Sequence, residues 1–394
     1  MEITIKKIIY PGKSLGTSGA KTILTDRGLP GEIVEIAPAE EKKSYIEAIT
    51  VKIISPSPHR IAPKCSHYKA CSPYHDIYYK TQLDIKESQL KEIFPDIPIK
   101  TIPSPEIWEY RNKIKLNVIW KDKKAHLAYH IPESRNKFIQ IDSCFLVSEN
   151  VNKFLALFIN TVNKENLTSI KEIEVRESYT TKKLMFTAYL PVKIENIQAS
   201  RYIEEIVSGK TFRIGPGSFF QINVPMLEIA LKEMQKFIAP DKKEIIADLY
   251  CGVGTFGIAL SDLAREIIGI ESEPVNISFL KSNIKLNKIE NFKIYEGRCE
   301  KLFSMLINKG IDVLILDPPR KGLDNTLCQN ITLSSIKKII YLSCNPVTLS
   351  RDLKILSRSY PLKNLYLLDF FPHTPHIETL AMLEKNDCKL NHII

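Results

Sequence analysis

The sequence predicts an α/β protein made of three parts. Its 394 residues exceed the length of one ordinary domain. The spacing of apolar residues also changes twice, once near residue 58 and again near residue 210. These observations predict a small β-barrel over residues 1–58, a central α+β region over 59–210 and an open, Rossmann-like α/β sheet over 211–394.

Residues 1–56 carry the pattern of a small barrel. Short runs of alternating apolar residues are separated by Gly and Pro turns, as in "EITIKKIIYPGKSLG" and "KTILTDRGLPGEIVEIA", and no helical period appears. This predicts an OB-like barrel of about five strands, a shape that commonly presents a face to RNA or other ligands. The prolines of "SPSPHRIAPK" then predict a linker.

The central region mixes helical and strand patterns. In "YYKTQLDIKESQLKEIF" the apolar residues Leu83, Leu90, Ile93 and Phe94 have helical spacing. The run "NKIKLNVIW" instead alternates lysine with apolar residues, which predicts a strand with one basic face in water. We expect an antiparallel sheet with a few helices and its basic residues outward, suited to binding RNA.

Beyond residue 211 the pattern is that of an open α/β sheet. Apolar runs end in polar residues, Gly or Pro, and several are separated by segments of helical length. In such sheets, ligands gather beyond the carboxyl ends of the strands. The runs are "EIIADLY", "EIIGIES", "FKIYEG", "DVLILDPP" and "KIIYLSCNP".

The composition indicates which kinds of partner the protein can bind. The formal net charge is +10, from 55 Lys and Arg against 45 Asp and Glu. Such an excess favours a polyanion, because phosphate binding releases counterions. No apolar run approaches the roughly 20 residues that span a bilayer, and the first residues lack the features of a secretory signal. We therefore expect a cytoplasmic protein with no membrane partner, and nothing requires more than a monomer.

A glycine-rich turn predicts a cofactor site. "DLYCGVGTFG" places Gly252, Gly254 and Gly257 between a strand and an expected helix, where glycine lets a ligand approach the backbone closely. Glu271 ends the next strand, where a carboxylate can accept both hydroxyls of a ribose. This spacing alone suits a dinucleotide as well as S-adenosylmethionine.

Asp317 begins the next motif, Asp-Pro-Pro-Arg, at a strand end. An acidic or amide residue followed by two prolines is typical of nucleic-acid methyltransferases, where it holds the polar edge of a flipped base near the methyl donor. The alternative is a structural strand cap with a Pro-Pro turn.

Cys344 ends the strand after that of Asp317, and Glu378 precedes another apolar run, so all three side chains should share one crevice. Carbon 5 of uracil is a poor nucleophile, and a thiolate that adds to carbon 6 makes it reactive. A base must then remove the proton from carbon 5, and Asp317 can support charge on the base oxygen. The alternatives are a buried structural thiol and a surface carboxylate.

With these motifs the chain resembles the RNA uracil-5-methyltransferase family, and within it the enzymes with an N-terminal TRAM domain that methylate large-subunit ribosomal RNA. The resemblance rests on "LPGE", "GSFFQIN", "DLYCGVGTFG", "GIESEP", "LDPPRKG", "SCNPVTLSRDL" and "HIETLAML". It implies that Cys344 is the nucleophile, Glu378 the base and Asp317 a contact to the target uracil. It also implies S-adenosylmethionine as methyl donor, bound by Gln221, Tyr250, Gly252, Gly254, Glu271 and Asp317.

One departure concerns an iron–sulfur cluster, which some members of the family hold with four cysteines. Cys65, Cys71 and Cys144 match three of those positions, whereas Tyr74 stands at the remaining one. Three thiolates are one short of the usual set. His67 or His75 as a substitute ligand, and a relic of a lost site, both stay open.

The expected function is therefore methylation of carbon 5 of a uridine in RNA. 23S ribosomal RNA is the favoured target, because tRNA specialists of the family usually lack the N-terminal barrel. The alternatives are a tRNA uridine methyltransferase, a methyltransferase for another position and a catalytically inactive RNA-binding factor. The sequence does not identify the uridine, which we expect to flip out of its stack.

Overall fold

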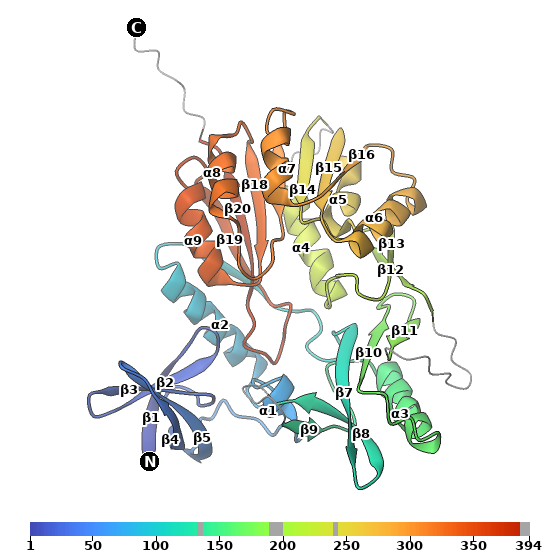
Figure 1. Cartoon of the computed structure of the whole chain (residues 1–394). Coiled ribbons are helices and arrows are strands. Elements are labelled where there is room, and N and C mark those ends of the chain that lie inside the picture. Colours follow the sequence, from blue (N-terminus) through green and yellow to red (C-terminus); the bar gives the residue numbers. More distant parts are fainter. Residues whose placement is uncertain (132–136, 189–199, 239–242, 387–394) are drawn as a thin grey trace. The chain divides into compact units, whose positions relative to one another are not determined.

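The computed structural model describes residues 1–131, 137–188, 200–238 and 243–386 (Figure 1). The chain divides into two compact units. Unit 1 contains Met1–Ile97 together with Phe371–Ile377, a short loop that comes from far along the sequence. Unit 2 contains Pro98–Phe370 and resumes at Glu378. In the part of the chain that is described, no helix combines the length and apolar character needed to cross a bilayer.

Unit 1 begins with a closed barrel whose strand order is β1-β2-β3-β5-β4, which confirms the predicted five strands. Side chains alternate between the inside and the outside, so Ile3, Ile5, Ile23 and Val34 form its core. The strands are β1 (Glu2–Ile9), β2 (Lys13–Ser18), β3 (Lys21–Thr25), β4 (Ile33–Glu41) and β5 (Tyr45–Ser55).

Two helices complete unit 1, α1 (Tyr68–Cys71) and α2 (Tyr79–Ile93), the latter at the predicted place. The segment between the barrel and α2 is held to the barrel by buried ion pairs. Arg60 bonds Glu32 and Asp76 at 2.9 and 2.8 Å, and Arg27 also bonds Asp76. Each carboxylate is at most 4% exposed.

Unit 2 contains the expected antiparallel sheet, in the order β11-β10-β7-β8-β9. Helix α3 packs on it through Val151, Phe154 and Phe158. The lysines of β7 do point outward as predicted, but they are ion-paired. Lys113 and Lys115 lie 2.9 and 2.8 Å from Glu174 and Glu172 of β10, so carboxylates neutralise this face.

The elements of this region are β7 (Lys113–Lys121), β8 (Lys124–His130), β9 (Phe138–Gln140), α3 (Glu149–Lys164), β10 (Glu172–Glu177) and β11 (Leu184–Thr187). A separate hairpin follows, formed by β12 (Ile203–Val207) and β13 (Lys210–Ile214).

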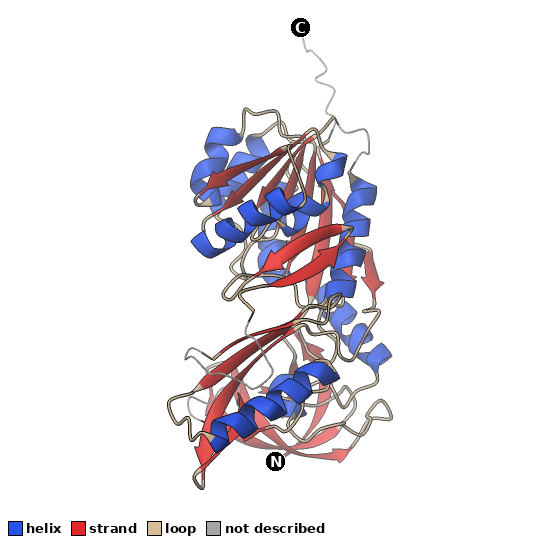
Figure 2. Ribbon diagram, turned by 90° about the vertical axis from the view of Figure 1, so that its right-hand side faces the viewer, coloured by secondary structure: helices blue, strands red, loops and turns tan. Residues whose placement is uncertain are grey.

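The second sheet of unit 2 is the predicted Rossmann-like sheet, with helices on both of its faces (Figure 2). Its order is β16-β15-β14-β17-β18-β20-β19-β6. The first five of these strands run parallel, because each is joined to the next in sequence by a helical crossover, and β20 is antiparallel. Strand β6 (Ile99–Ile102), which no sequence pattern indicated, pairs with β19.

The strands of this sheet are β14 (Ile245–Leu249), β15 (Glu266–Glu271), β16 (Phe292–Glu296), β17 (Val313–Leu316), β18 (Lys338–Ser343), β19 (Leu362–Leu368) and β20 (Glu378–Glu384). The helices are α4 (Val224–Phe237), α5 (Thr255–Ala259), the 3₁₀ turn η1 (Ser261–Leu263), α6 (Pro274–Leu286), α7 (Cys299–Leu306), α8 (Asn325–Leu333) and α9 (Pro346–Leu356).

Candidate active site

The sheet topology brings Asp317, Cys344 and Glu378 to one edge. Strands β17, β18 and β20 are neighbours in the sheet. Ser343 pairs with Thr379 in the antiparallel ladder, so the next residues, Cys344 and Glu378, stand opposite each other. Asp317 follows the last residue of β17, which runs parallel to β18. The three residues therefore lie at the ends of three adjacent strands, on one edge of the sheet.

Burial raises the pKa of both Cys344 and Glu378. The Cys344 thiol is half-buried, and burial, with the nearby carboxylates of Glu378 and Asp317, raises its pKa to about 11. Glu378 is 3% exposed, and burial followed by the charge of Asp317 raises its pKa well above the ordinary value. These shifts are of the kind that mark functional carboxylates and thiols.

Arg320 is a member of this site that the sequence analysis did not single out. Its positive charge lowers the pKa of both Cys344 and Glu378, against the effect of burial. Its carbonyl oxygen accepts hydrogen bonds from Asn345 and Thr348, at 3.1 and 3.3 Å, which ties the two motifs together. Its position directly after the two prolines of the Asp317 motif was the available signal.

Gln221 links the predicted cofactor residues to Asp317. Its side-chain amide donates a hydrogen bond to Asp317 Oδ2 at 3.4 Å. Burial raises the pKa of Asp317 to about 7, although the Gln221 hydrogen bond works in the opposite direction. A pKa in this range allows both the neutral and the charged form of a carboxyl group near neutral pH.

The glycine turn has the geometry of a ligand cradle. Gly252 has φ +58°, and a Cβ added there would have no neighbour within 4 Å. Its amide donates to Glu271 Oε2 at 2.8 Å, so the open space lies beside this carboxylate. Gly254, by contrast, is required for packing, because a Cβ there would lie 2.5 Å from Leu280 Cδ1.

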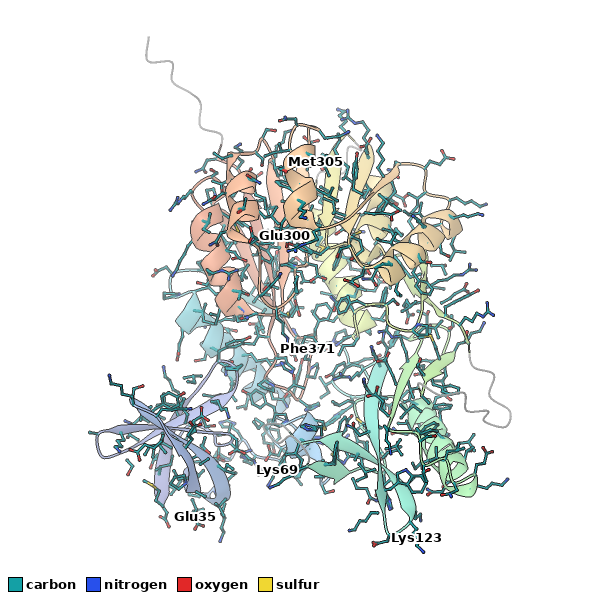
Figure 3. All side chains as sticks on the ribbon, in the orientation of Figure 1. Glu35, Lys69, Lys123, Glu300, Met305 and Phe371 are labelled. Carbon is teal, nitrogen blue, oxygen red and sulfur yellow. The ribbon has the colours of Figure 1, made fainter. Side chains whose placement is uncertain are left out.

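Tyr250 precedes this turn, with φ +62°. Its hydroxyl donates to Glu300 Oε1 of α7 at 3.3 Å, and Figure 3 labels Glu300. The residue is thus held at the carboxyl end of β14, next to the predicted cofactor turn.

Asp248 of β14 is a second residue that the sequence analysis did not single out. It is fully buried, its Oδ2 accepts the Gly257 amide at 2.8 Å, and its Oδ1 has no hydrogen-bond partner. Burial, followed by the charges of Asp317 and Glu271, raises its pKa to about 8. The site thus combines the open space at Gly252, the carboxylate of Glu271, which can bind a ribose, and the unpaired Oδ1 of Asp248. These features together fit a cationic ligand with hydroxyl groups, such as S-adenosylmethionine.

The three cysteines that suggested an iron–sulfur cluster do not all belong to one unit. Cys65 Sγ lies 3.9 Å from His75 Nδ1, and Cys71 Sγ lies 3.4 Å from Ser72 Oγ, both in unit 1. Cys144 belongs to unit 2, where its thiol accepts a hydrogen bond from Tyr129. Over residues 1–131, 137–188, 200–238 and 243–386, no group of three or more His, Cys, Asp or Glu side chains is placed to hold a metal ion.

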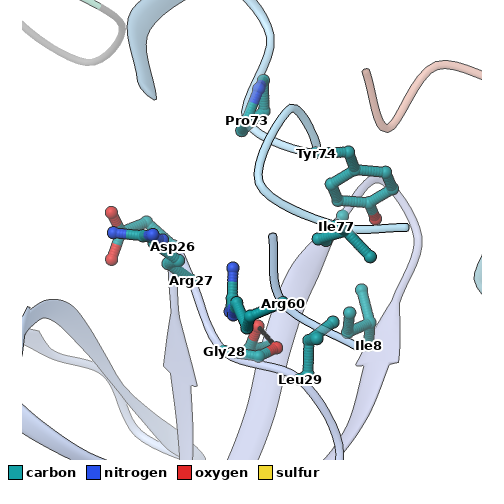
Figure 4. Close-up of a pocket in the computed structure, with 11 residues that line it drawn as sticks. Ile8, Asp26, Arg27, Gly28, Leu29, Arg60, Pro73, Tyr74 and Ile77 are labelled. Carbon is teal, nitrogen blue, oxygen red and sulfur yellow. Dashed lines mark hydrogen bonds between the residues drawn. The ribbon is translucent and has the colours of Figure 1, made fainter. Parts of the chain in front are cut away.

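Unit 1 also contains a pocket, between the barrel and the segment that precedes α2 (Figure 4). Its lining includes the apolar residues Ile8, Leu29 and Ile77 and the arginines Arg27 and Arg60. Both arginines are already paired with carboxylates. None of the predicted catalytic or cofactor residues lines this pocket.

Comparison with known proteins supports this interpretation. Residues 191–386 match the family model for tRNA (uracil-5-)-methyltransferase. Two relatives described as uncharacterized RNA methyltransferases, from Clostridium acetobutylicum and Aquifex aeolicus, are each 29% identical. Each alignment covers 98% of this chain, with 97% and 99% of the relative.

Among solved structures, the tRNA (uracil-54, C5)-methyltransferase of Pyrococcus abyssi, in complex with S-adenosyl-L-homocysteine, is similar over 97% of this chain and 99% of its own, with 25% identity and a TM-score of 0.78. These comparisons confirm the resemblance that the motifs predict, to the RNA uracil-5-methyltransferase family, whose members are S-adenosylmethionine-dependent enzymes.

Proposed function

We propose that this protein methylates carbon 5 of a uridine in RNA by covalent catalysis through Cys344. The observation that carries the proposal is the register of β18 and β20, which sets Cys344 opposite Glu378 at the strand end beside Asp317. A thiol, a carboxylate and a group able to bond the base edge are the parts that this chemistry needs. Methylation of an exocyclic amine would not need the thiol.

The proposed sequence of steps uses each residue once. The Cys344 thiolate forms a bond to carbon 6, and the electrons of the 5,6 double bond move onto the oxygen at carbon 4. Asp317, when neutral, donates a hydrogen bond to that oxygen. S-adenosylmethionine, when bound, supplies the methyl group to carbon 5. Glu378 then takes the proton from carbon 5, the double bond re-forms, and the carbon–sulfur bond breaks to return the thiolate.

The site must first produce a thiolate from a thiol whose pKa is raised to about 11. Arg320 is the cationic group that opposes this shift. We assign Arg320 the role of stabilising the thiolate, because a positive charge next to a thiol favours its ionised form.

The methyl donor would be held at the glycine turn. Glu271 accepts the ribose hydroxyls, Gly252 allows close approach, and Tyr250, Gly254, Gln221 and Asp317 complete the wall. No step is assigned to an iron–sulfur cluster, because three cysteines are one short of the usual four ligands.

The target RNA can be narrowed to two candidates. The family resemblance favours 23S ribosomal RNA, with the barrel and the central sheet gripping the folded RNA from a cytoplasmic monomer. The Pyrococcus structure favours tRNA as the second candidate. Its alignment spans 97% of this chain, which must include most of the barrel, so a barrel does not by itself exclude a tRNA target. A catalytically inactive RNA-binding factor would have no use for the three strand-end residues.

The test is covalent trapping. The protein is incubated with S-adenosylmethionine and ribosomal RNA that contains 5-fluorouridine, and the products are separated on a denaturing gel. Fluorine leaves no proton for Glu378 to remove, so the intermediate should remain as a protein–RNA adduct, which the Cys344→Ala variant should not form. Parallel lanes hold tRNA with the same label. An adduct with tRNA alone would select the second target, and no adduct with either RNA would contradict the proposal.

A further inference from the structure

We propose that helix α2 and the barrel hold the loop Phe371–Ile377 and in this way position the catalytic carboxylate of Glu378. Gln82 and Lys86 are the positioning residues. The inference rests on the proposed role of Glu378 as the base. It assigns to the N-terminal unit a part in the chemistry itself, in addition to binding RNA.

Helix α2 buries an unusual stripe of polar side chains. Gln82, Lys86 and Gln89 are 0%, 0% and 1% exposed, and their spacing of four and three residues places them on one face of the helix. Long polar side chains are rarely buried in this way unless they have partners, because desolvation is costly. Two of the three have their partners in the loop.

Gln82 binds the backbone and the side chain of the same loop residue. Its Oε1 accepts the His373 amide at 2.8 Å, and its Nε2 lies 3.1 Å from His373 Nδ1. The same Nε2 donates to the carbonyl of Ile77 at 2.9 Å. His373 has φ +64°, a left-handed conformation that a residue with a Cβ rarely adopts, so the contacts hold the loop in a conformation it would not favour alone.

Lys86 holds the start of the loop. Its Nζ donates to the carbonyl oxygen of Phe371 at 3.0 Å, and Figure 3 labels Phe371. Within the loop, Thr374 Oγ1 donates to the same carbonyl at 2.9 Å. Phe371 O thus accepts from a fully buried ammonium group and from the loop itself.

Two further parts of unit 1 contact the loop. The amide of Tyr74 donates to the carbonyl of His373 at 3.0 Å. In the turn between β1 and β2, a Cβ added to Gly12 would lie 2.5 Å from Pro375 Cβ, so the barrel lies directly against the loop. The loop is therefore held by α2, by the segment before α2 and by the barrel.

The chain passes from this loop directly into the site. Ile377 ends the loop and Glu378, the next residue, opens β20. Consecutive Cα atoms are about 3.8 Å apart, so a shift of the loop end is transmitted to the carboxylate. Misplacing a catalytic group by about 1 Å can cost on the order of 10²-fold in rate.

The experiment compares Gln82→Leu and Lys86→Met with the wild type on RNA that contains ordinary uridine. Both changes keep the approximate volume and remove the hydrogen bonds to the loop. We expect turnover to fall about 10-fold or more. We also expect a covalent protein–RNA adduct to accumulate, because the step that Glu378 performs becomes slow while attack by Cys344 does not. Adduct formation on 5-fluorouridine RNA should stay within about twofold of wild type.

Gln89→Leu is the matched control, because it makes the same change on the same buried face of α2 at a residue without a hydrogen bond to the loop. It should show wild-type turnover and no accumulated adduct. If both positioning variants release product at the wild-type rate, the inference is overturned. It is also overturned if their adduct formation on 5-fluorouridine RNA falls in parallel with turnover, since that pattern indicates a structural role. If the wild type forms no adduct on 5-fluorouridine RNA, that result would instead reject the proposed function.

Discussion

Buried carboxylates in the two units of this protein have pKa values shifted in opposite directions. In unit 1, Glu32 and Asp76 are buried with arginine partners. Burial alone would raise the pKa of Glu32, but hydrogen bonds from Arg60, Leu29 and Ser57 outweigh it and hold this pKa below its ordinary value. In unit 2, Glu378 is equally buried, and its pKa is raised well above the ordinary value.

The difference shows that burial alone does not decide the character of a carboxylate. Where an arginine donates directly, the buried charge is kept and serves structure. Where burial and an acidic neighbour dominate, the pKa is raised, which is common for groups that transfer protons. The arginine-paired carboxylates of unit 1 should therefore affect the free energy of unfolding, and Glu378 in unit 2 should affect the rate of the reaction.

The largest effect should come from removing the proton acceptor in unit 2. Glu378→Gln should lower kcat by about 10²–10⁴-fold, the usual contribution of a general base. The covalent adduct should accumulate on ordinary uridine, which a denaturing gel would show. The thermal midpoint should not fall, because an amide of similar size replaces a carboxyl group whose charged form is disfavoured by burial. A large loss of thermal stability would mean that Glu378 belongs with the structural carboxylates.

The converse change is Arg60→Met in unit 1. It leaves Glu32 and Asp76 buried with reduced compensation, so the free energy of unfolding should fall by about 3 kcal/mol in a denaturant titration. Because the pKa of Glu32 is lowered by folding, its stabilising contribution is present above the unfolded pKa and is lost as pH falls through the folded pKa. The variant should therefore lose less stability on acidification than the wild type. If acidification lowered the stability of the wild type and of the variant equally, the pair Arg60–Glu32 would not be the source of the pH dependence.

The dependence of kcat/KM on pH tests the role of a third buried carboxyl group, that of Asp317. Below the Cys344 pKa of about 11, the thiolate fraction rises about tenfold per pH unit. Above the Asp317 pKa of about 7, its neutral, donating form falls by the same factor. Wild-type kcat/KM should therefore rise up to about pH 7 and then become flat.

Asp317→Asn keeps a hydrogen-bond donor at every pH, so its kcat/KM should continue to rise above neutral pH. Initial rates from about pH 6 to pH 9 would show the difference. If the variant became flat at the same pH as the wild type, another group would be responsible.

The smallest effect is expected at an exposed pair, which serves as the reference for both sets. Lys80 and Asp84 lie 2.6 Å apart on α2, with side chains 82% and 57% exposed. Such pairs contribute little, so Lys80→Ala should move the thermal midpoint by no more than about 1 °C and leave turnover unchanged. A shift as large as that of Arg60→Met would remove the distinction between buried and exposed pairs.

The local patterns in the sequence predicted the elements and the strand-end residues. Alternation in the first 56 residues predicted the barrel, and the motifs of Asp317 and Cys344 predicted the strand ends where these residues lie. Their roles remain predictions that the experiments above address. The TRAM assignment of the barrel and the three domain boundaries also remain predictions.

What the sequence could not predict depends on distant partners. The sequence pattern gave no signal at Gln82 and Lys86, because their partners are almost 300 residues further along the chain. The lysines of β7 suggested a free basic face, because the opposing glutamates belong to β10. Arg320 acts on Cys344 through space, so its position after the two prolines could indicate a place in the site but not this partner.

Strand β6 has a consequence for how the protein is made. It leaves the ribosome long before its partner β19, which begins at Leu362. The edge of the catalytic sheet therefore stays incomplete until β19 has been synthesised. Contacts that close over so long a stretch of sequence form slowly. A truncated catalytic half that began after β6 would expose β19 as an open edge and would be prone to aggregate.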